Sequence, residues 1–314
     1  MRRLPVVVSA AMVAGVVGAV GGLDGAAAAR ARPAAAVPVA GSLVNGIPVS
    51  YAATLTGARE GTAVAVITVM ADRVFFALRW KGFVPESGHL HEGDGEGNRR
   101  TDGPTGKRAP AKVALISKAM PDTVRAAAGQ VELTDPGLAG RIVVNPTGFT
   151  VDLRSAQLPG GSVQGRLTRL GQSLSPLAIT RQAVGGAPRA GALRALASGG
   201  QEVPKGDRSK VGDPDGRAMA ELRTDGTAID YAYAWFNIQS PSKGHLHKGA
   251  PGRNGDVVLD FFNRPVPDGI FAVSGRLEGV KRAVVKRVQD DPQDYYANIH
   301  TAEFPDGAVR GQLA

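Results

Sequence analysis

The sequence contains one pattern of residues twice, and this internal repetition restricts its fold more than any other feature. Residues 88–93 read Gly-His-Leu-His-Glu-Gly, and residues 244–249 read Gly-His-Leu-His-Lys-Gly. The chain has only two tryptophans, Trp80 and Trp235, and each lies in an alternating run shortly before one of these segments. Because a duplicated module repeats its residues at a fixed spacing, the two halves are expected to fold alike.

The spacing downstream of the His-x-His segments is repeated as well. Arg154 follows Gly129 by 25 residues, just as His300 follows Gly275 by 25. The one sizeable difference in length is an insertion of about ten residues after the first His-x-His segment. This insertion is basic, and we place it at residues 97–112.

Both halves show the period-two alternation that is typical of half-buried strands. Val74–Leu78 and Ala228–Trp235 are rich in β-branched and aromatic residues, and Gly, Pro and Asp interrupt the chain at short intervals. Thr123–Ala128 is the one stretch with a possible helical pattern. The sequence therefore predicts an all-β fold.

The repetition and the strand pattern together predict two tandem antiparallel, Greek-key-like β-sandwiches. We place them at residues 46–171 and 192–314, a common size for that architecture. Between them, residues 172–191 are rich in Ala, Gly, Ser and Pro, which is typical of a linker.

The N-terminal region has the pattern of a secretory signal peptide. Arg2 and Arg3 precede an apolar run, Pro5–Leu23, and an alanine-rich stretch follows. A retained membrane anchor is the alternative, but the run is interrupted by glycines and weakly hydrophobic for a span of about 20 residues. We expect removal of residues 1–31, a disordered segment at 32–45, and a secreted, extracellular mature chain without a transmembrane span. The chain has no cysteine, so its stability must come from a packed core.

The net charge of +9 raises the question of nucleic-acid binding, but the distribution of charge argues against it. Residues 191–314 carry 16 Lys and Arg against 16 Asp and Glu. The excess lies near the N-terminus and in the stretch from Arg99 to Arg125, which has no interleaved aromatic residues. We therefore expect no nucleic-acid partner.

Three segments of the second half carry a resemblance to a known family. They are residues 198–204 (Ser-Gly-Gly-Gln-Glu-Val-Pro), residues 244–255, which contain the His-x-His segment, and residues 296–313, which contain His300. In these segments the second half resembles the CHRD domain, the module first named from chordin. The resemblance implies an extracellular β-rich module that works by binding.

The first half is similar to a diverged CHRD domain. It keeps the His-x-His segment and the closing Gly-x-Val-x-Gly-x-Leu pattern, but it lacks Gln-Glu-Val-Pro and has Arg154 at the position of His300. The chain also has a fainter likeness to copper/zinc superoxide dismutase-like sandwiches, which carry a His-x-His strand and a later histidine.

The five histidines are the candidate site residues. In a strand, residues i and i+2 point to the same face, so His245 and His247 should project side by side. His300, from a neighbouring strand, would supply a third nitrogen at the short distance that copper or zinc requires. Calcium is disfavoured because it prefers oxygen ligands. The alternative is structural, because imidazoles can also hydrogen-bond backbone groups and hold a loop closed.

In the first half the equivalent set is His89, His91 and Arg154. A guanidinium cannot act as a metal donor, so this set is a degenerate version of the candidate metal site. Glu92, Asp94 and Glu96 could supply a replacement donor, although the glycine-spaced run Gly93–Gly97 is more simply a solvated turn.

The sequence thus favours a secreted, non-catalytic binding or structural protein with an unidentified extracellular or cell-envelope ligand. The alternative is a transition-metal binding or redox protein that uses copper or zinc at the second-half histidines. The chain has no Gly-x-Ser-x-Gly motif, and we assign no catalytic residue and no cofactor-binding residue.

Overall fold

The computed structural model describes residues 46–57, 61–93, 111–158, 161–183 and 191–314. The predicted signal peptide (1–31), the N-terminal segment (32–45), Asp94 and Glu96 lie outside the described residues. The predicted basic insertion lies outside them as well, apart from Ala111 and Lys112. The described residues are mostly in antiparallel strands, as the all-β prediction requires, with three short α-helices.

The first repeat is a rolled sheet with the strand order β5–β4–β7–β8–β1–β2–β3–β6. The elements are β1 (Val49–Thr56), β2 (Thr62–Met70), β3 (Arg73–Lys81), β4 (Ser87–Glu92), β5 (Ala111–Ile116), β6 (Val124–Glu132), α1 (Leu138–Val144), η1 (Pro146–Gly148), β7 (Phe149–Arg154), β8 (Ser162–Arg166) and the short β9 (Thr168–Arg169).

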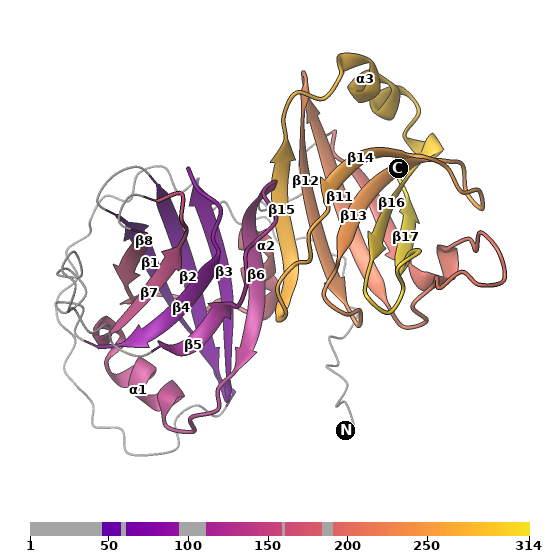
Figure 1. Cartoon of the computed structure of the whole chain (residues 1–314). Helices are drawn as coiled ribbons and strands as arrows, with labels where there is room; N and C mark the ends of the chain where they lie inside the picture. Colours follow the sequence, from indigo (N-terminus) through magenta and orange to yellow (C-terminus); the bar gives the residue numbers. More distant parts are fainter. Residues whose placement is uncertain (1–45, 58–60, 94–110, 159–160, 184–190) are drawn as a thin grey trace. The chain divides into compact units, whose positions relative to one another are not determined.

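The second repeat has the order β14–β13–β16–β17–β10–β11–β12–β15, which matches the first repeat strand for strand. Its elements are β10 (Leu193–Ser198), η2 (Gly199–Gln201), β11 (Arg217–Asp225), β12 (Ala228–Phe236), β13 (Lys243–Lys248), β14 (Val257–Phe262), β15 (Ile270–Leu277), α3 (Arg282–Asp290), η3 (Pro292–Asp294), β16 (Tyr295–His300) and β17 (Val309–Gln312). Figure 1 shows the strands of each repeat curving into a rolled sheet.

The two repeats share one continuous sheet, which differs from the predicted pair of separate sandwiches. β6 of the first repeat pairs antiparallel with β15, its equivalent in the second. Gly129 lies opposite Ile270, and Gly275 lies opposite Val124. At Gly129 an added Cβ would stand 2.7 Å from the Gly269 carbonyl oxygen, so the glycine permits this close approach. The pairing satisfies two strand edges that would otherwise expose their backbone groups.

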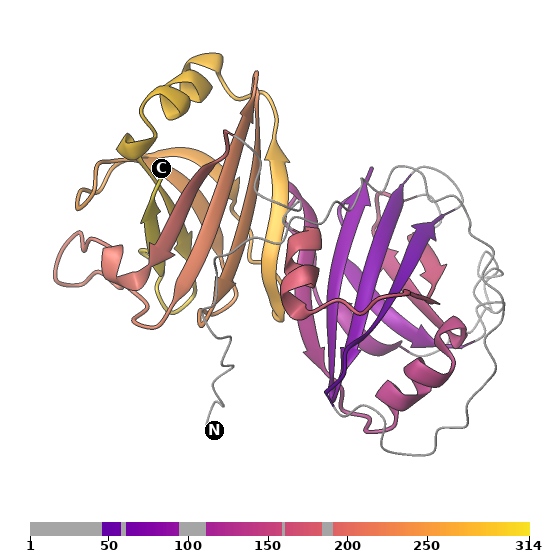
Figure 2. The same ribbon diagram turned by 180° about the vertical axis from the view of Figure 1, so that it is seen from behind.

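A helix in the predicted linker covers this junction. α2 (Pro176–Ala183) turns Ile179 and Ala183 toward the sheet, where they pack with Phe75, Ala128 and Ala272. These three residues come from β3, β6 and β15. Figure 2 shows α2 lying against these strands. The segment therefore holds the sheet across the repeat boundary as well as linking the halves.

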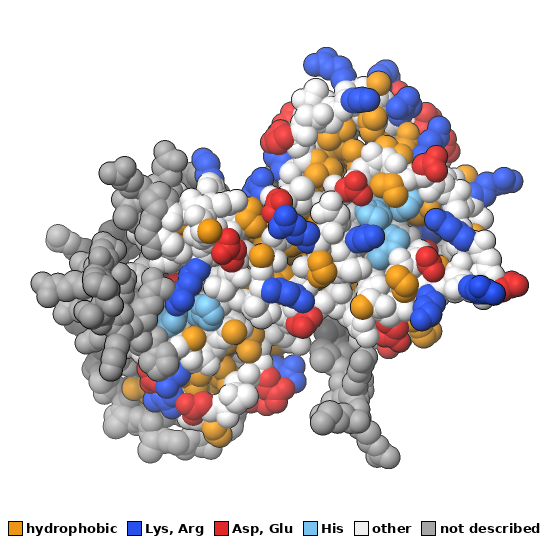
Figure 3. Space-filling model, in the orientation of Figure 1, with side chains coloured by type: hydrophobic (Ala, Val, Ile, Leu, Met, Phe, Trp, Pro, Cys, Tyr) orange, Lys and Arg blue, Asp and Glu red, His pale blue; other side chains and the backbone are white. Residues whose placement is uncertain are grey.

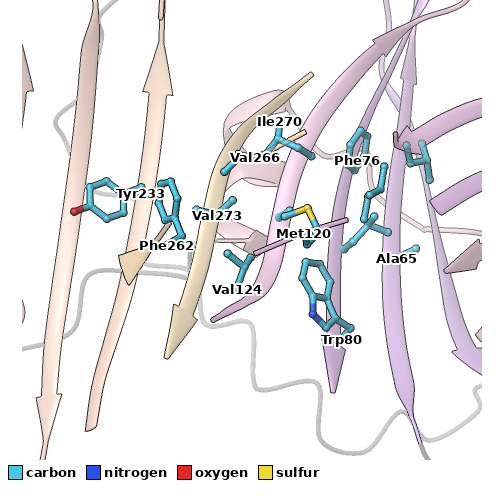
Figure 4. Packing of buried hydrophobic residues seen from close by; sticks show 14 of the residues in the cluster. Ala65, Phe76, Trp80, Met120, Val124, Tyr233, Phe262, Val266, Ile270 and Val273 are labelled. Atoms are coloured by element: carbon cyan, nitrogen blue, oxygen red, sulfur yellow. The ribbon is translucent and has the colours of Figure 1, made fainter. Parts of the chain in front are cut away.

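The core is apolar and aromatic, and it explains two sequence features. Trp80 and Trp235 occupy equivalent strand positions and are only 3% and 5% exposed. They pack with the rest of the buried cluster, part of which appears in Figure 4. The possible helix at Thr123–Ala128 is wrong, because most of it forms the start of β6. Its small residues fit between two paired strands, where tertiary pairing overrides alanine's preference for helix.

Among the residues that the structure describes, no helix has both the length and the hydrophobicity needed to cross a membrane.

Candidate metal centre

The candidate site lies on the face of β13 and β16 that points away from the core. Leu246 on β13 points into the core, so its neighbours His245 and His247 point to the opposite face. On β16, Tyr296, Asn298 and His300 share that outer face for the same reason. The register places His245 opposite Asn298 and His247 opposite Tyr296.

The structure brings His245, His247 and His300 together as a buried cluster. One nitrogen from each lies within 4.8 Å of the other two. The His245 and His300 ring centroids are 4.8 Å apart, and those of His245 and His247 are 5.6 Å apart. The residues are 7–9% exposed, and Figure 3 shows histidine atoms at the surface of both repeats. The cluster therefore lies just beneath the surface.

The second nitrogen of each ring is held by the surrounding chain. His247 Nδ1 donates to the Gly255 carbonyl at 3.0 Å, and His300 Nδ1 donates to the Pro305 carbonyl at 2.9 Å. His245 Nε2 lies 3.3 Å from the Asp260 carboxylate. Carbonyl and carboxylate oxygens accept hydrogen bonds. These contacts therefore favour a proton on the ring nitrogen that makes the contact in each histidine. The opposite nitrogens, His245 Nδ1, His247 Nε2 and His300 Nε2, then carry lone pairs.

These three nitrogens are buried and have no hydrogen-bond partner within the described residues. Buried polar atoms in proteins are nearly always paired, so three together need an explanation. Histidines that bind metals usually donate their other N–H to a carbonyl or carboxylate, which fixes the tautomer and the ring orientation. The contacts of this cluster follow that pattern.

The electrostatics keep the three imidazoles neutral. Burial, together with the neighbouring His300, His247 and Lys243, lowers the pKa of His245 to about 3. Burial also lowers the pKa values of His247 and His300, although their hydrogen bonds to Gly255 and Pro305 act in the opposite direction. Neutral imidazole is the form that binds a metal.

A cationic and aromatic stack supports one side of the site. The Tyr296 ring lies parallel to that of His247, with centroids 4.8 Å apart and an interplanar angle of 4°. The Arg310 guanidinium sits 3.5 Å from the centre of the Tyr296 ring and donates to the carbonyls of Ala250 and Arg253. Arg310 is 1% exposed, so it fixes both the stack and the loop that carries the carbonyl partner of His247.

The first repeat has the same layout with different chemistry. Asp152, which corresponds to Asn298, lies opposite His89. His89 Nδ1 is 3.1 Å from Asp152 Oδ1, and His91 Nε2 is 3.4 Å from Asp152 Oδ2. Arg154 Nε donates to Asp152 Oδ2 at 2.9 Å. These hydrogen bonds outweigh burial and hold the pKa of Asp152 well below its usual range.

The third group beside His89 and His91 is therefore the Asp152 carboxylate. These three side chains also have the composition of a metal site, but Arg154 is bound to the carboxylate. Glu92, which the sequence offered as a replacement donor, is bound by Arg141 at 2.6 Å and lies 3.5 Å from Lys112. Sequence reasoning missed Asp152. The signal was present in the spacing, since Asp152 and Asn298 precede Arg154 and His300 by the same two residues.

The two repeats thus differ in what they offer a ligand. Three converging neutral nitrogens suit zinc or copper, which accept imidazole ligands, and they suit calcium poorly. In the first repeat the carboxylate already accepts hydrogen bonds from its neighbours. The arrangement in the second repeat could hold a transition-metal ion and leave room for one further ligand.

Comparison with known proteins identifies one domain. Residues 193–313 match the family model of the CHRD domain, so the second repeat is a CHRD domain that contains all three clustered histidines. A search of curated proteins finds no match to this chain.

Proposed function

We propose that this CHRD-domain protein binds a transition-metal ion, copper or zinc, through His245 Nδ1, His247 Nε2 and His300 Nε2. One observation carries the proposal. Three buried histidines each bring one nitrogen within 4.8 Å of the other two, and each ring has a buried nitrogen without a partner in the described part of the chain. Removing such groups from water is unfavourable unless something binds them, and a metal ion would satisfy all three at once.

The surrounding chain supports this role in two ways. The pKa values of all three histidines are lowered, so a metal ion would displace few protons at neutral pH. The hydrogen bonds to Gly255 and Pro305 orient two of the rings before any ion arrives, which reduces the entropy lost on binding.

We further propose that the protein acts outside the cytoplasm as a non-catalytic binding or structural module. The N-terminal Arg2-Arg3 and the apolar run Pro5–Leu23 support this location. The first repeat would be a diverged CHRD copy that serves as a scaffold. Its identical strand order supports the common origin, and the Asp152–Arg154 pair supports the loss of metal binding.

The test is metal analysis of the full chain and of two matched variants. After loading with copper or zinc and removal of excess metal, the wild-type protein is expected to retain about one ion per chain. His247→Ala should retain almost none, because two imidazoles hold a metal weakly. His91→Ala, the same change in the first repeat, should retain the wild-type amount. Equal and substoichiometric metal in all three proteins would contradict the proposal.

A second candidate is a purely structural role for the histidines. It is favoured by the bonds from His247 and His300 to Gly255 and Pro305, which fasten two loops against the sheet. Thermal unfolding distinguishes the two candidates. Metal binding predicts that copper or zinc raises the melting temperature of the wild type by several degrees and leaves that of His300→Ala unchanged. The structural role predicts no shift in either protein.

A further inference from the structure

Asn298 is the buried polar side chain beside the three histidines that the proposed metal site leaves unexplained. It is 3% exposed and lies on the outer face of β16, directly opposite His245 and two residues before His300. Its Oδ1 atom is buried and accepts no hydrogen bond from any described residue. The carboxamide is therefore satisfied on one side only.

Glu202 fixes the orientation of this carboxamide. Asn298 Nδ2 donates to Glu202 Oε1 at 2.9 Å and to Oε2 at 3.2 Å. An ionised carboxylate only accepts hydrogen bonds, so ionised Glu202 holds the amide nitrogen toward itself and the oxygen points elsewhere. Glu202 follows η2, nearly a hundred residues before Asn298, and packs against Gly307, where an added Cβ would meet its carboxylate at 2.6 Å. The hydrogen bonds thus hold the segment after η2 against β16.

The first repeat indicates where Asn298 Oδ1 points. Asp152, at the equivalent position, reaches His89 Nδ1 and His91 Nε2. The corresponding atoms in the second repeat are His245 Nδ1 and His247 Nε2, two of the three nitrogens without a partner. A side chain at this strand position thus reaches the atoms that would hold the metal, and Asn298 has the same register.

From this geometry we infer that Asn298 positions a water molecule as the fourth ligand of the metal, with Asn298 Oδ1 accepting a hydrogen bond from that water. The inference rests on the proposed metal site. Three imidazoles leave one position of a tetrahedral ion for an outside ligand. Water on the metal is a strong hydrogen-bond donor, and an amide oxygen only accepts, so the two groups are complementary. Glu202 acts through Asn298 by holding its amide in place.

Azide binding to the cobalt(II)-loaded full chain tests the inference. Azide has no hydrogen to donate to Asn298 Oδ1, so it must displace the water at the expense of that hydrogen bond. Visible absorption of cobalt reports the exchange. We expect Asn298→Ala to bind azide about five- to tenfold more tightly than wild type, the factor that corresponds to one hydrogen bond. Its cobalt affinity should change by less than about tenfold, because no metal ligand is removed.

Variants of Glu202 separate positioning from simple packing. Glu202→Gln still offers an oxygen to Asn298 Nδ2 and should bind azide as wild type does. Glu202→Ala releases the amide and should approach the azide affinity of Asn298→Ala. Glu278→Ala, an exposed carboxylate in the same repeat, is the matched control and should behave as wild type.

The results discriminate between the two proposals. Equal azide affinity in wild type and Asn298→Ala overturns the inference and leaves the metal site intact. A loss of cobalt affinity of about a hundredfold or more in Asn298→Ala also overturns it, because Asn298 would then be a direct ligand. Failure of the wild type to take up cobalt, copper or zinc removes the metal site and the inference with it.

Discussion

Equivalent strand positions in the two repeats lie at the same place in the sheet but carry polar residues of different chemistry. In the first repeat, Asp152 faces two histidines and is bound by Arg154. In the second repeat, Asn298 and His300 occupy these two positions, and three nitrogens remain without a protein partner among the described residues. Different residues at two positions of one strand therefore separate a cluster whose charges are paired within the protein from a cluster that leaves three nitrogens unpaired among the described residues.

The comparison also shows that the same strand order can carry different polar groups. A carboxylate buried among imidazoles is unfavourable unless a positive charge accompanies it. Arg154 supplies that charge permanently, whereas a metal ion would supply it only when bound. The buried Asp152 carboxylate of the first repeat is therefore paired whether or not a metal ion is present. At the proposed metal site of the second repeat an ion would supply this charge, and four predictions test this difference.

Converting the second repeat into the first should have the largest effect. The double variant Asn298→Asp/His300→Arg recreates the carboxylate–guanidinium pair beside His245 and His247. We expect it to lose metal affinity by about a thousandfold or more, because the His300 imidazole is lost and the new carboxylate is paired with the new guanidinium, as Asp152 is with Arg154. Isothermal titration with copper and zinc measures the loss. Retained tight binding would show that the two positions do not decide the difference.

The reverse exchange should give the first repeat a metal site. Asp152→Asn/Arg154→His replaces the internal ion pair with the residues of the second repeat. We expect the metal content of the loaded full chain to rise from about one ion to about two. The new site should gain roughly a hundredfold in affinity over the original first repeat, since a third imidazole joins His89 and His91. Unchanged metal content would mean that the supporting loops, not the strand residues, create the site.

Removing the buried carboxylate should destabilise the first repeat. Asp152→Ala leaves the Arg154 guanidinium and two imidazoles without their shared partner. Arg154 is 36% exposed and can be solvated, so we expect a loss of about 2 kcal/mol in the free energy of unfolding. Urea denaturation measures it. Asn298→Ala in metal-free protein is the matched control. It should lose less stability, because it removes a hydrogen bond to Glu202 and breaks no ion pair. Equal losses of unfolding free energy in the two variants would show that the charge network around Asp152 contributes no extra stability.

Acid should weaken the second repeat before the first in metal-free protein. Histidines with lowered pKa values stay neutral when folded and bind protons when unfolded, so their stabilisation is lost as the pH falls below about 6.5. Glu202, whose pKa burial raises to about 7, acts in the opposite direction. The stabilisation from Asp152 is lost only below the usual pKa of an aspartate.

From pH 7 to 5.5 we therefore expect a net loss of about 1 kcal/mol, seen as faster hydrogen exchange in β13 and β16 than in β4 and β7. Saturating zinc should remove the difference between the repeats. Exchange that rises equally in both repeats would contradict this assignment.

The clustering of the three histidines was predictable because it depends on local rules. Residues two apart share a strand face, and the repeated spacing aligned His300 with Arg154. The contribution of Glu202 was not predictable, because it depends on how the segment after η2 folds over β16. The β6–β15 pairing could not be predicted from the sequence either, because the pairing of two edge strands depends on the shape of both repeats. The α2 helix was missed because its apolar face is formed by few residues within a stretch rich in small ones.

The antiparallel ladder between β6 and β15 has a consequence for how the chain behaves when it is cut. Because the halves are joined by backbone hydrogen bonds and by α2 as well as by the peptide chain, a single proteolytic nick between them would not release either half. The nicked fragments would migrate together under native conditions and separate only in denaturant.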